Sequence, residues 1–259
     1  MKKKIFYFFI FIITILIIFL SLKGSRYTGV DYLVYKEKIS NFQKIKEFYT
    51  RYYNYKQLVK KITYNLEKEK DEIIKISEWI YLNINKKTDK VSTIDSHPWT
   101  IIERKIGVKD QFSDILSVLL VINNTDSFFI SKINKLYKFD PLTFFKYENK
   151  WSIIDPYYGI YFVNNEKEFC SLEEHKKNKC IILHLKYGEI SNDKISEIFF
   201  DKHFKNYDEL INYYDLIFKY IPSTENIENT NIYLRGGRSY VQRPVHRLIY
   251  QIQKYLNLI

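Results

Sequence analysis

The sequence predicts an α+β domain that follows one N-terminal membrane helix. An uninterrupted apolar segment lies near the amino terminus, at residues 5–20. Apolar residues then recur at helical spacing in stretches up to Ile122. From Ser127 to Leu185 the pattern changes to short segments rich in Phe, Ile and Tyr, which is typical of strands, and helical spacing returns after Phe199. Helices, then an antiparallel sheet, then helices are the order expected of an α+β fold.

Length and composition exclude several classes of protein. A chain of 259 residues with 46% hydrophobic residues can form one sizeable domain and is not disordered throughout. It contains no alanine, and Ile, Lys, Asn, Tyr and Phe are abundant, which is typical of an AT-rich genome. The net charge is +11, but most basic residues are lysines interspersed with acids, as on a solvated surface. Because no zinc-finger spacing, RNP motif or heptad array is present, we predict no nucleic-acid partner.

The amino terminus has the features of a membrane anchor. Lys2, Lys3 and Lys4 precede the apolar run, which only Thr14 interrupts. No pair of small residues suited to signal-peptide cleavage follows the run, so we favour an uncleaved signal anchor over a cleaved signal peptide. We therefore predict a cytoplasmic segment at 1–4, a single span at 5–22 and an exported remainder, since lysines before a span stay in the cytoplasm.

The helices are expected in the following order. Residues 31–48 and 55–68 have the pattern of polar helices, and together they form a helical N-terminal extension at 23–68. Residues 71–84 form a clearer helix, followed by a polar loop at 86–98. Residues 108–122 are apolar on most sides, which predicts a buried helix.

The strands and the last helices complete the prediction. Strands are expected at 127–137, 142–147, 151–155, 157–163 and 180–185, with a turn at 148–150. A helix at 199–220, a polar loop at 223–231 and a last helix from Pro244 to Leu258 should follow. We divide the exported part, beyond the N-terminal extension, into a core at 69–165 and a C-terminal extension of strand and helices at 166–259.

Three stretches resemble the bacterial transglutaminase-like branch of the papain-like superfamily. Asp71–Ile80 is similar to the helix that precedes the active site of this family. Arg104–Phe112, with Gly107 followed by Lys109-Asp110-Gln111, is similar to its Gly-x-Cys-Asp-Gln-type motif. Lys150–Gly159 is similar to its Trp-x-x-x-Asp-Pro-x-x-Gly segment. The resemblance implies a papain-like core, a buried helix packed on an antiparallel sheet, and a location in the bacterial inner membrane with the domain exported.

The family's chemistry is acyl transfer by a Cys-His-Asp triad, in which a thiolate at a helix amino terminus attacks a carbonyl. Here the cysteine position holds Lys109, and the histidine position, eleven residues before Trp151, holds Asp140. Only Asp155 matches the triad aspartate. The resemblance therefore implies a pseudoenzyme without cofactor or metal, whose degenerate positions form a charge-paired Lys109–Asp140–Asp155 cluster. The alternative is that Lys109 extends to solvent.

Two cysteines, Cys170 and Cys180, flank His175 at equal spacing. Export allows a disulfide, and the pattern also contains three potential metal ligands without a fourth nearby. We rank two reduced cysteines first, a disulfide second and a metal site last.

Arginines are concentrated near the carboxyl end. The chain has seven, and four of them lie within thirteen residues: Arg235, Arg238, Arg243 and Arg247. One interpretation is a loop and helix start tied to acidic residues of the same domain. The other is a site for an anionic glycan or a lipid phosphate, since the guanidinium group suits such ligands.

The predicted function is that of a membrane-anchored, exported binding or scaffolding protein of the envelope, linked to surface polysaccharide or the cell wall. The protein partner is not predicted. The alternative is an active acyl transferase or peptidase that uses residues outside the family triad.

Overall fold

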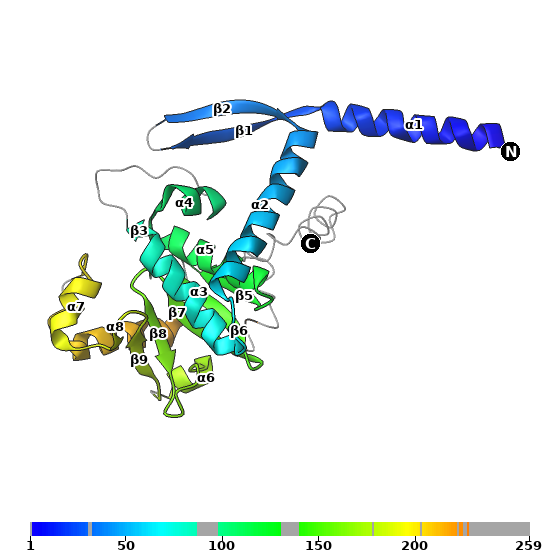
Figure 1. Cartoon of the computed structure of the whole chain (residues 1–259). Helices are drawn as coiled ribbons and strands as arrows, with labels where there is room; N and C mark the ends of the chain where they lie inside the picture. The colour runs from blue at the N-terminus through cyan, green and yellow to red at the C-terminus, as the bar shows by residue number, and fades with distance from the viewer. Residues whose placement is uncertain are drawn as a thin grey trace.

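The computed structural model describes residues 2–30, 33–86, 98–130, 140–177, 179–202, 204–221, 223, 224 and 227. It confirms the α+β class. Helices pack around a six-stranded antiparallel sheet, and one apolar helix extends away from this body (Figure 1).

The extending helix is α1, Lys2–Ser21. It is long and apolar enough to cross a membrane, and none of it is buried against the rest of the protein. Thr14, which interrupts the apolar run, is hydrogen-bonded within the helix, because its hydroxyl donates to the Ile10 carbonyl at 2.9 Å. These properties fit a membrane span and a signal sequence equally.

A hairpin connects α1 to the next helix. Strands β1, Lys23–Val30, and β2, Leu33–Ser40, pair antiparallel with Lys23 opposite Ser40, which returns the chain to the end of α1. Helix α2, Asn41–Ile62, follows at once. The predicted helices at 31–48 and 55–68 are therefore wrong in their bounds. Ser40 ends the strand and caps one continuous helix, accepting a hydrogen bond from the Gln43 N–H at 3.1 Å.

Three helices pack together beside the sheet, and the central one of them contacts both of the others. Helices α3, Glu69–Asn83, and α5, Lys109–Ile122, confirm the predictions for 71–84 and 108–122. All side chains from 111 to 121 of α5 are buried. Helix α4, Pro98–Arg104, was not predicted, because its seven residues are too few to show a period. The remainder of the predicted 86–98 loop, residues 87–97, lies outside the described residues.

The sheet has the strand order β10-β9-β8-β7-β6-β5. Its strands are β5, Ser127–Ile130, β6, Leu142–Tyr147, β7, Lys150–Asp155, β8, Ile160–Val163, β9, Ile181–His184, and β10, Gly188–Glu189. Five predicted strands are confirmed, and those predicted at 157–163 and 180–185 are shorter than expected; residues 131–137 of the strand predicted at 127–137 lie outside the described residues. The predicted turn at 148–150 is confirmed at Glu148 and Asn149, which have positive φ as in a type I′ hairpin, whereas Lys150 already belongs to β7. The predicted division at 165 stays untested; β9 and β10 continue the same sheet.

Two packing layers hold the sheet. Helix α5 packs on β5 and β6, and Phe128 stacks on Phe144 with ring centroids 4.9 Å apart. The C-terminal helices are α6, Leu172–His175, α7, Asn192–Ile198, and α8, Tyr207–Tyr220. In α8, Tyr214 and Phe218 pack edge-to-face on Phe162 of β8.

The single helix predicted at 199–220 is wrong over its first eight residues. Helix α7 ends at Ile198, and α8 begins only after Asn206, whose side chain accepts from the Glu209 N–H at 3.0 Å. Of the predicted loop at 223–231, residues 223, 224 and 227 are described, and the predicted helix at 244–258 lies outside the described residues.

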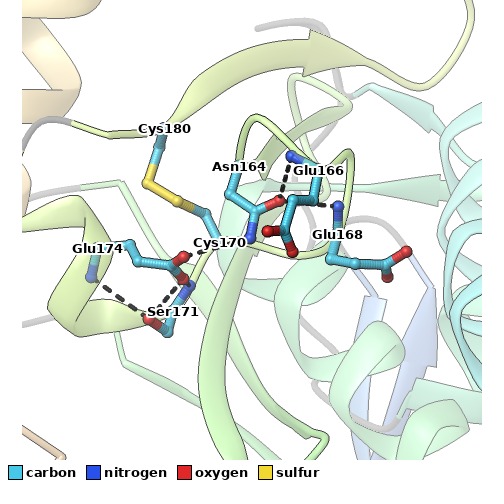
Figure 2. Close-up of a disulfide and its surroundings, with 7 residues drawn as sticks. All are labelled: Asn164, Glu166, Glu168, Cys170, Ser171, Glu174 and Cys180. Atoms are coloured by element: carbon cyan, nitrogen blue, oxygen red, sulfur yellow. Dashed lines mark hydrogen bonds between the residues drawn. A yellow bond between two sulfur atoms is a disulfide. The ribbon is translucent and has the colours of Figure 1, made fainter.

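The two cysteines are joined in a disulfide, shown in Figure 2. Their Cα atoms are 5.9 Å apart, within the range that a disulfide requires. The bond spans the capping box of α6, where the Ser171 N–H donates to Glu174 at 2.8 Å. Our first-ranked interpretation, two reduced cysteines, is therefore wrong, and the second-ranked one describes the structure.

Removing the disulfide should lower the free energy of unfolding. Replacing Cys170 and Cys180 with alanine frees a loop of ten residues, for which chain entropy predicts a loss of about 3 kcal/mol. Urea unfolding of the wild type and the double variant measures this loss. Reductant should lower the wild-type stability and leave the variant unchanged; a wild type that is insensitive to reductant would contradict the bond.

Candidate functional site

The candidate site lies at the amino terminus of α5, where the ends of two strands meet. Lys109 is the first residue of α5, Asp140 lies two residues before β6, and Asp155 is the last residue of β7. Strands β6 and β7 are antiparallel neighbours with Thr143 opposite Ile154, so the start of one lies beside the end of the other. The structure thus brings Lys109 and Asp140 together and places Asp155 at the end of the neighbouring strand, whereas their role as a functional site stays a prediction.

Lys109 is held by two carboxylates and a phenol. Its Nζ lies 3.1 Å from both oxygens of Asp140 and 2.8 Å from an oxygen of Asp201. It also donates to the Tyr158 hydroxyl at 2.6 Å, and Tyr158 in turn donates to Asp201 at 2.7 Å. A quarter of the side chain, 26%, is exposed. The alternative that Lys109 extends freely to solvent is therefore wrong.

Asp140 has a second cation. The Lys202 ammonium lies 2.9 Å from it, and the Tyr213 hydroxyl donates to it at 2.9 Å. Burial raises the pKa of Asp140, but the hydrogen bond and charge of Lys202, followed by those of Lys109, outweigh this and hold the pKa below its ordinary value. The same balance keeps Asp201 ionised, because Lys109 and Tyr158 donate to it. Asp140 and Asp201 are therefore anions paired with ammonium groups.

Asp155 is in a different environment. Its side chain is fully buried and accepts from the Tyr158 N–H at 3.2 Å and the Tyr214 hydroxyl at 3.0 Å. Burial, followed by repulsion from Asp140, raises its pKa to about 7. Asp155 thus joins the cluster through hydrogen bonds rather than through a direct ion pair with Lys109.

The turn that follows β7 sets the position of Tyr158. Gly159 has φ of 73°, a left-handed conformation that favours glycine. A Cβ at this position would lie 2.8 Å from the ring of Tyr81. The glycine of the Asp-Pro-x-x-Gly segment is therefore needed for the turn that directs Tyr158 to Lys109.

A third ammonium lies beside the cluster. Strand β3, Asn85–Lys86, pairs in parallel with β4, Ile106–Gly107, which brings Lys86 next to the start of α5. The Lys86 ammonium lies within 6 Å of the centroids of four rings: Tyr81, Tyr157, Tyr158 and Phe200. Burial lowers its pKa to about 8, against the attraction of Asp155 and Asp201. The rings supply cation–π attraction to this ammonium.

The arrangement limits the chemistry of the site. An ionised ammonium is not a nucleophile, and the charges of Asp201 and Asp140 outweigh burial and raise the pKa of Lys109 further. Ser113, one turn further along α5, donates to the Pro141 carbonyl at 2.9 Å. Cys170 and Cys180 are consumed in the disulfide, although His175 lies beside their sulfurs. The Lys109 ammonium lies between Asp140 and Asp201, within hydrogen-bond distance of both carboxylates.

Several site residues were not predicted from the sequence. Asp201 and Lys202 fall inside the incorrectly predicted 199–220 helix, and Tyr213 belongs to α8. They lie so far from Lys109 along the chain that no local sequence pattern links them to it. The four arginines predicted as a ligand site, at 235, 238, 243 and 247, lie outside the described residues, so that prediction stays open.

Comparison with known proteins identifies no family. No family model matches the chain, and no curated protein matches it. Among solved structures, the chain is similar to a crystal structure of a TGase, with 11% identity and a TM-score of 0.34. The similarity covers 51% of this chain and 43% of that one, and it shows neither family membership nor function.

Removing the charge of Lys109 should destabilise the fold. Lys109→Met keeps the apolar stem but leaves Asp140 and Asp201 with less cationic compensation. Because the site is partly exposed, we expect a loss of about 2 kcal/mol, less than for a fully buried pair. Lys194→Met, which removes the exposed ion pair with Glu197, is the matched control and should cost much less, because solvent screens that pair. Equal losses in urea unfolding would contradict the cluster.

Asp155 should make stability depend on pH. Its pKa is about 7 in the folded chain and about 3.8 when unfolded, so between these values only the folded state binds the proton. Stability from this group is therefore full below pH 4 and falls as pH rises toward 7. Asp155→Asn should flatten the curve of unfolding free energy over this range. A variant whose curve remains parallel to that of the wild type would contradict the raised pKa.

Proposed function

We propose that this chain is a membrane-anchored, exported protein that binds or scaffolds other components of the bacterial envelope. Its domain would be a transglutaminase-like pseudoenzyme. In this proposal α1 is a signal anchor, and the domain lies on the exported side of the inner membrane. A link to surface polysaccharide or the cell wall rests on the resemblance and the predicted location alone.

One observation carries the proposal. The family resemblance assigns nucleophile, base and orienting acid to the positions of Lys109, Asp140 and Asp155. These positions are remote in sequence, yet they meet at the amino terminus of one buried helix, as the family's chemistry requires. This convergence supports the motif alignment. The ammonium–carboxylate contacts at the first two positions support the loss of acyl-transfer chemistry.

The pairing also accounts for how such a loss can be tolerated. A cation at a helix amino terminus opposes the helix dipole. The substitution of cysteine by lysine would therefore destabilise α5 unless anions lay nearby. Asp140 at the histidine position and Asp201 supply those anions.

Covalent probes separate this proposal from an active enzyme. Purified full-length protein should show no stoichiometric labelling with a fluorophosphonate or, without reductant, with iodoacetamide, because Ser113 is hydrogen-bonded and both cysteines are paired. Heat-unfolded protein serves as the control for nonspecific reaction. Labelling of one residue in the folded protein only would overturn the proposal in favour of an acyl transferase or peptidase that uses other residues.

Restoring the triad tests the alignment itself. Lys109→Cys with Asp140→His should give a thiol that alkylates faster at neutral pH than Lys109→Cys alone, since the imidazole lies beside it. The expected readout is a downward shift in the pH midpoint of alkylation. An identical midpoint in the two variants would mean that the positions are not aligned as a triad.

A further inference from the structure

The exposed face of α2 is the strongest feature that the candidate site does not use. Four large side chains recur along it at spacings of three and four residues: Phe42, Ile45, Tyr49 and Tyr53. Each is between 42% and 61% exposed, whereas Tyr55 and Val59 on another face of the same helix are buried. Such spacing places the four on one side of the helix. An unburied stripe of this kind needs an apolar or interfacial partner.

The same helix is strongly basic. It contains Lys44, Lys46, Arg51, Lys56, Lys60 and Lys61, against the single acid Glu47. Lys46, Lys56 and Lys60 are exposed on the side of the aromatic stripe. Aromatic residues beside lysines on one face are typical of helices that lie in the interface of a membrane with anionic headgroups.

The position of α2 follows from its hydrogen bonds to the last turn of α1 and to the residue that follows it. The Asn41 N–H donates to the Leu22 carbonyl at 2.9 Å, and the Asn41 side-chain amide donates to the Phe19 carbonyl at 3.0 Å. The β1–β2 hairpin makes these bonds possible, because its register returns the chain to the end of α1. Helix α2 therefore begins at the level where α1 would leave a bilayer.

The direction of α2 allows its whole length to contact a membrane surface. Figure 1 shows α2 running crosswise to α1, with α3 and α5 on the side away from α1. If α1 crosses the bilayer, α2 lies along the surface and not away from it. The buried face of α2 is then turned to the domain, which leaves the stripe to the membrane.

From these observations we propose that α2 is an interfacial helix. Its stripe of Phe42, Ile45, Tyr49 and Tyr53 inserts into the headgroup region of a bilayer that contains anionic phospholipid. This contact would fix the orientation of the domain on the membrane. The inference rests on the proposed anchor role of α1.

Depth-dependent quenching in vesicles tests the contact. Tyr53→Cys is labelled with an environment-sensitive fluorophore in the full chain, where both native cysteines are paired. Position 53 lies about three turns from the start of α2, so it reaches the surface only if α2 lies along it. The matched control is Glu189→Cys on β10, which is also exposed. Vesicles contain phosphatidylcholine with or without phosphatidylglycerol, and a spin label on the lipid headgroup.

We expect quenching at position 53 and none at 189, with stronger quenching when phosphatidylglycerol is present. Charge reversal of Lys46, Lys56 and Lys60 to glutamate should lower the quenched fraction, since each lysine near an anionic surface changes the equilibrium roughly fivefold. Reversal of the exposed Lys150, Lys176 and Lys177 is the control and should change nothing.

The outcomes separate the two proposals. Protein that stays in the vesicles after an alkaline wash, with position 53 no more quenched than 189, overturns the interfacial helix and leaves the anchor intact. Quenching that is indifferent to phosphatidylglycerol overturns the anionic preference. Protein that washes off vesicles of every composition overturns the anchor, and the interfacial helix with it.

Discussion

The site depends on one interaction, the pairing of the Lys109 ammonium with the carboxylates of Asp140 and Asp201. This ammonium lies at the amino terminus of a buried helix. Helix α5 cannot shift to relieve its charge, because it is buried from residue 111 to residue 121. Its amino-terminal N–H groups carry partial positive charge, so a cation at the first position adds to an unfavourable field. Compensation must therefore come from other elements. The ends of β6 and β7 and the segment after α7 provide it, since they bring carboxylates and phenols to this point.

Tyrosines divide the cluster into two electrostatic environments. Tyr158 accepts from Lys109 and donates to Asp201, and Tyr213 donates to Asp140, so both phenols extend an ion-paired network that is partly open to solvent. Tyr214 donates instead to the fully buried Asp155. Burial and repulsion from Asp140 outweigh this hydroxyl donor, so the pKa of Asp155 remains raised. Carboxylates of the same residue type thus shift in opposite directions: burial raises the pKa of Asp155, whereas ammonium groups hold the pKa values of Asp140 and Asp201 below the ordinary value.

The sequence predicted the parts of the fold in which local pattern and burial agree. The α5 helix has an apolar period on most sides, and β6 and β7 are aromatic-rich strands joined by a tight turn. The 23–40 hairpin was missed because Ile39, Phe42 and Ile45 imitate a helical period across the strand end. The capping roles of Ser40 and Asn206 were signals present in the sequence that would have placed the starts of α2 and α8.

For the site, motif spacing located Lys109, Asp140 and Asp155, but it could not locate their partners. Asp201 and Lys202 lie in an irregular segment between two helices, more than 90 residues after Lys109 along the chain. No periodicity fixes the direction of a side chain in such a segment. Their contacts with Lys109 and Asp140 are tertiary and have no local signature in the sequence.

Charge distribution connects the site to the rest of the molecule. The net charge of +11 suggests a generally basic surface. In the structure, however, the charges are paired in one region and unbalanced in another. At the site, Lys109 and Lys202 face Asp140 and Asp201, so their charges balance. Helix α2 contains six basic residues and one acid among its 22 residues. Its net charge of +5, six minus one, is nearly half of the net charge of +11 of the chain. Of these two regions, the excess of positive charge therefore lies on α2 and not at the Lys109 cluster. If α1 is the anchor proposed above, the basic helix α2 is held beside the headgroups of the membrane, where its excess charge favours anionic lipid.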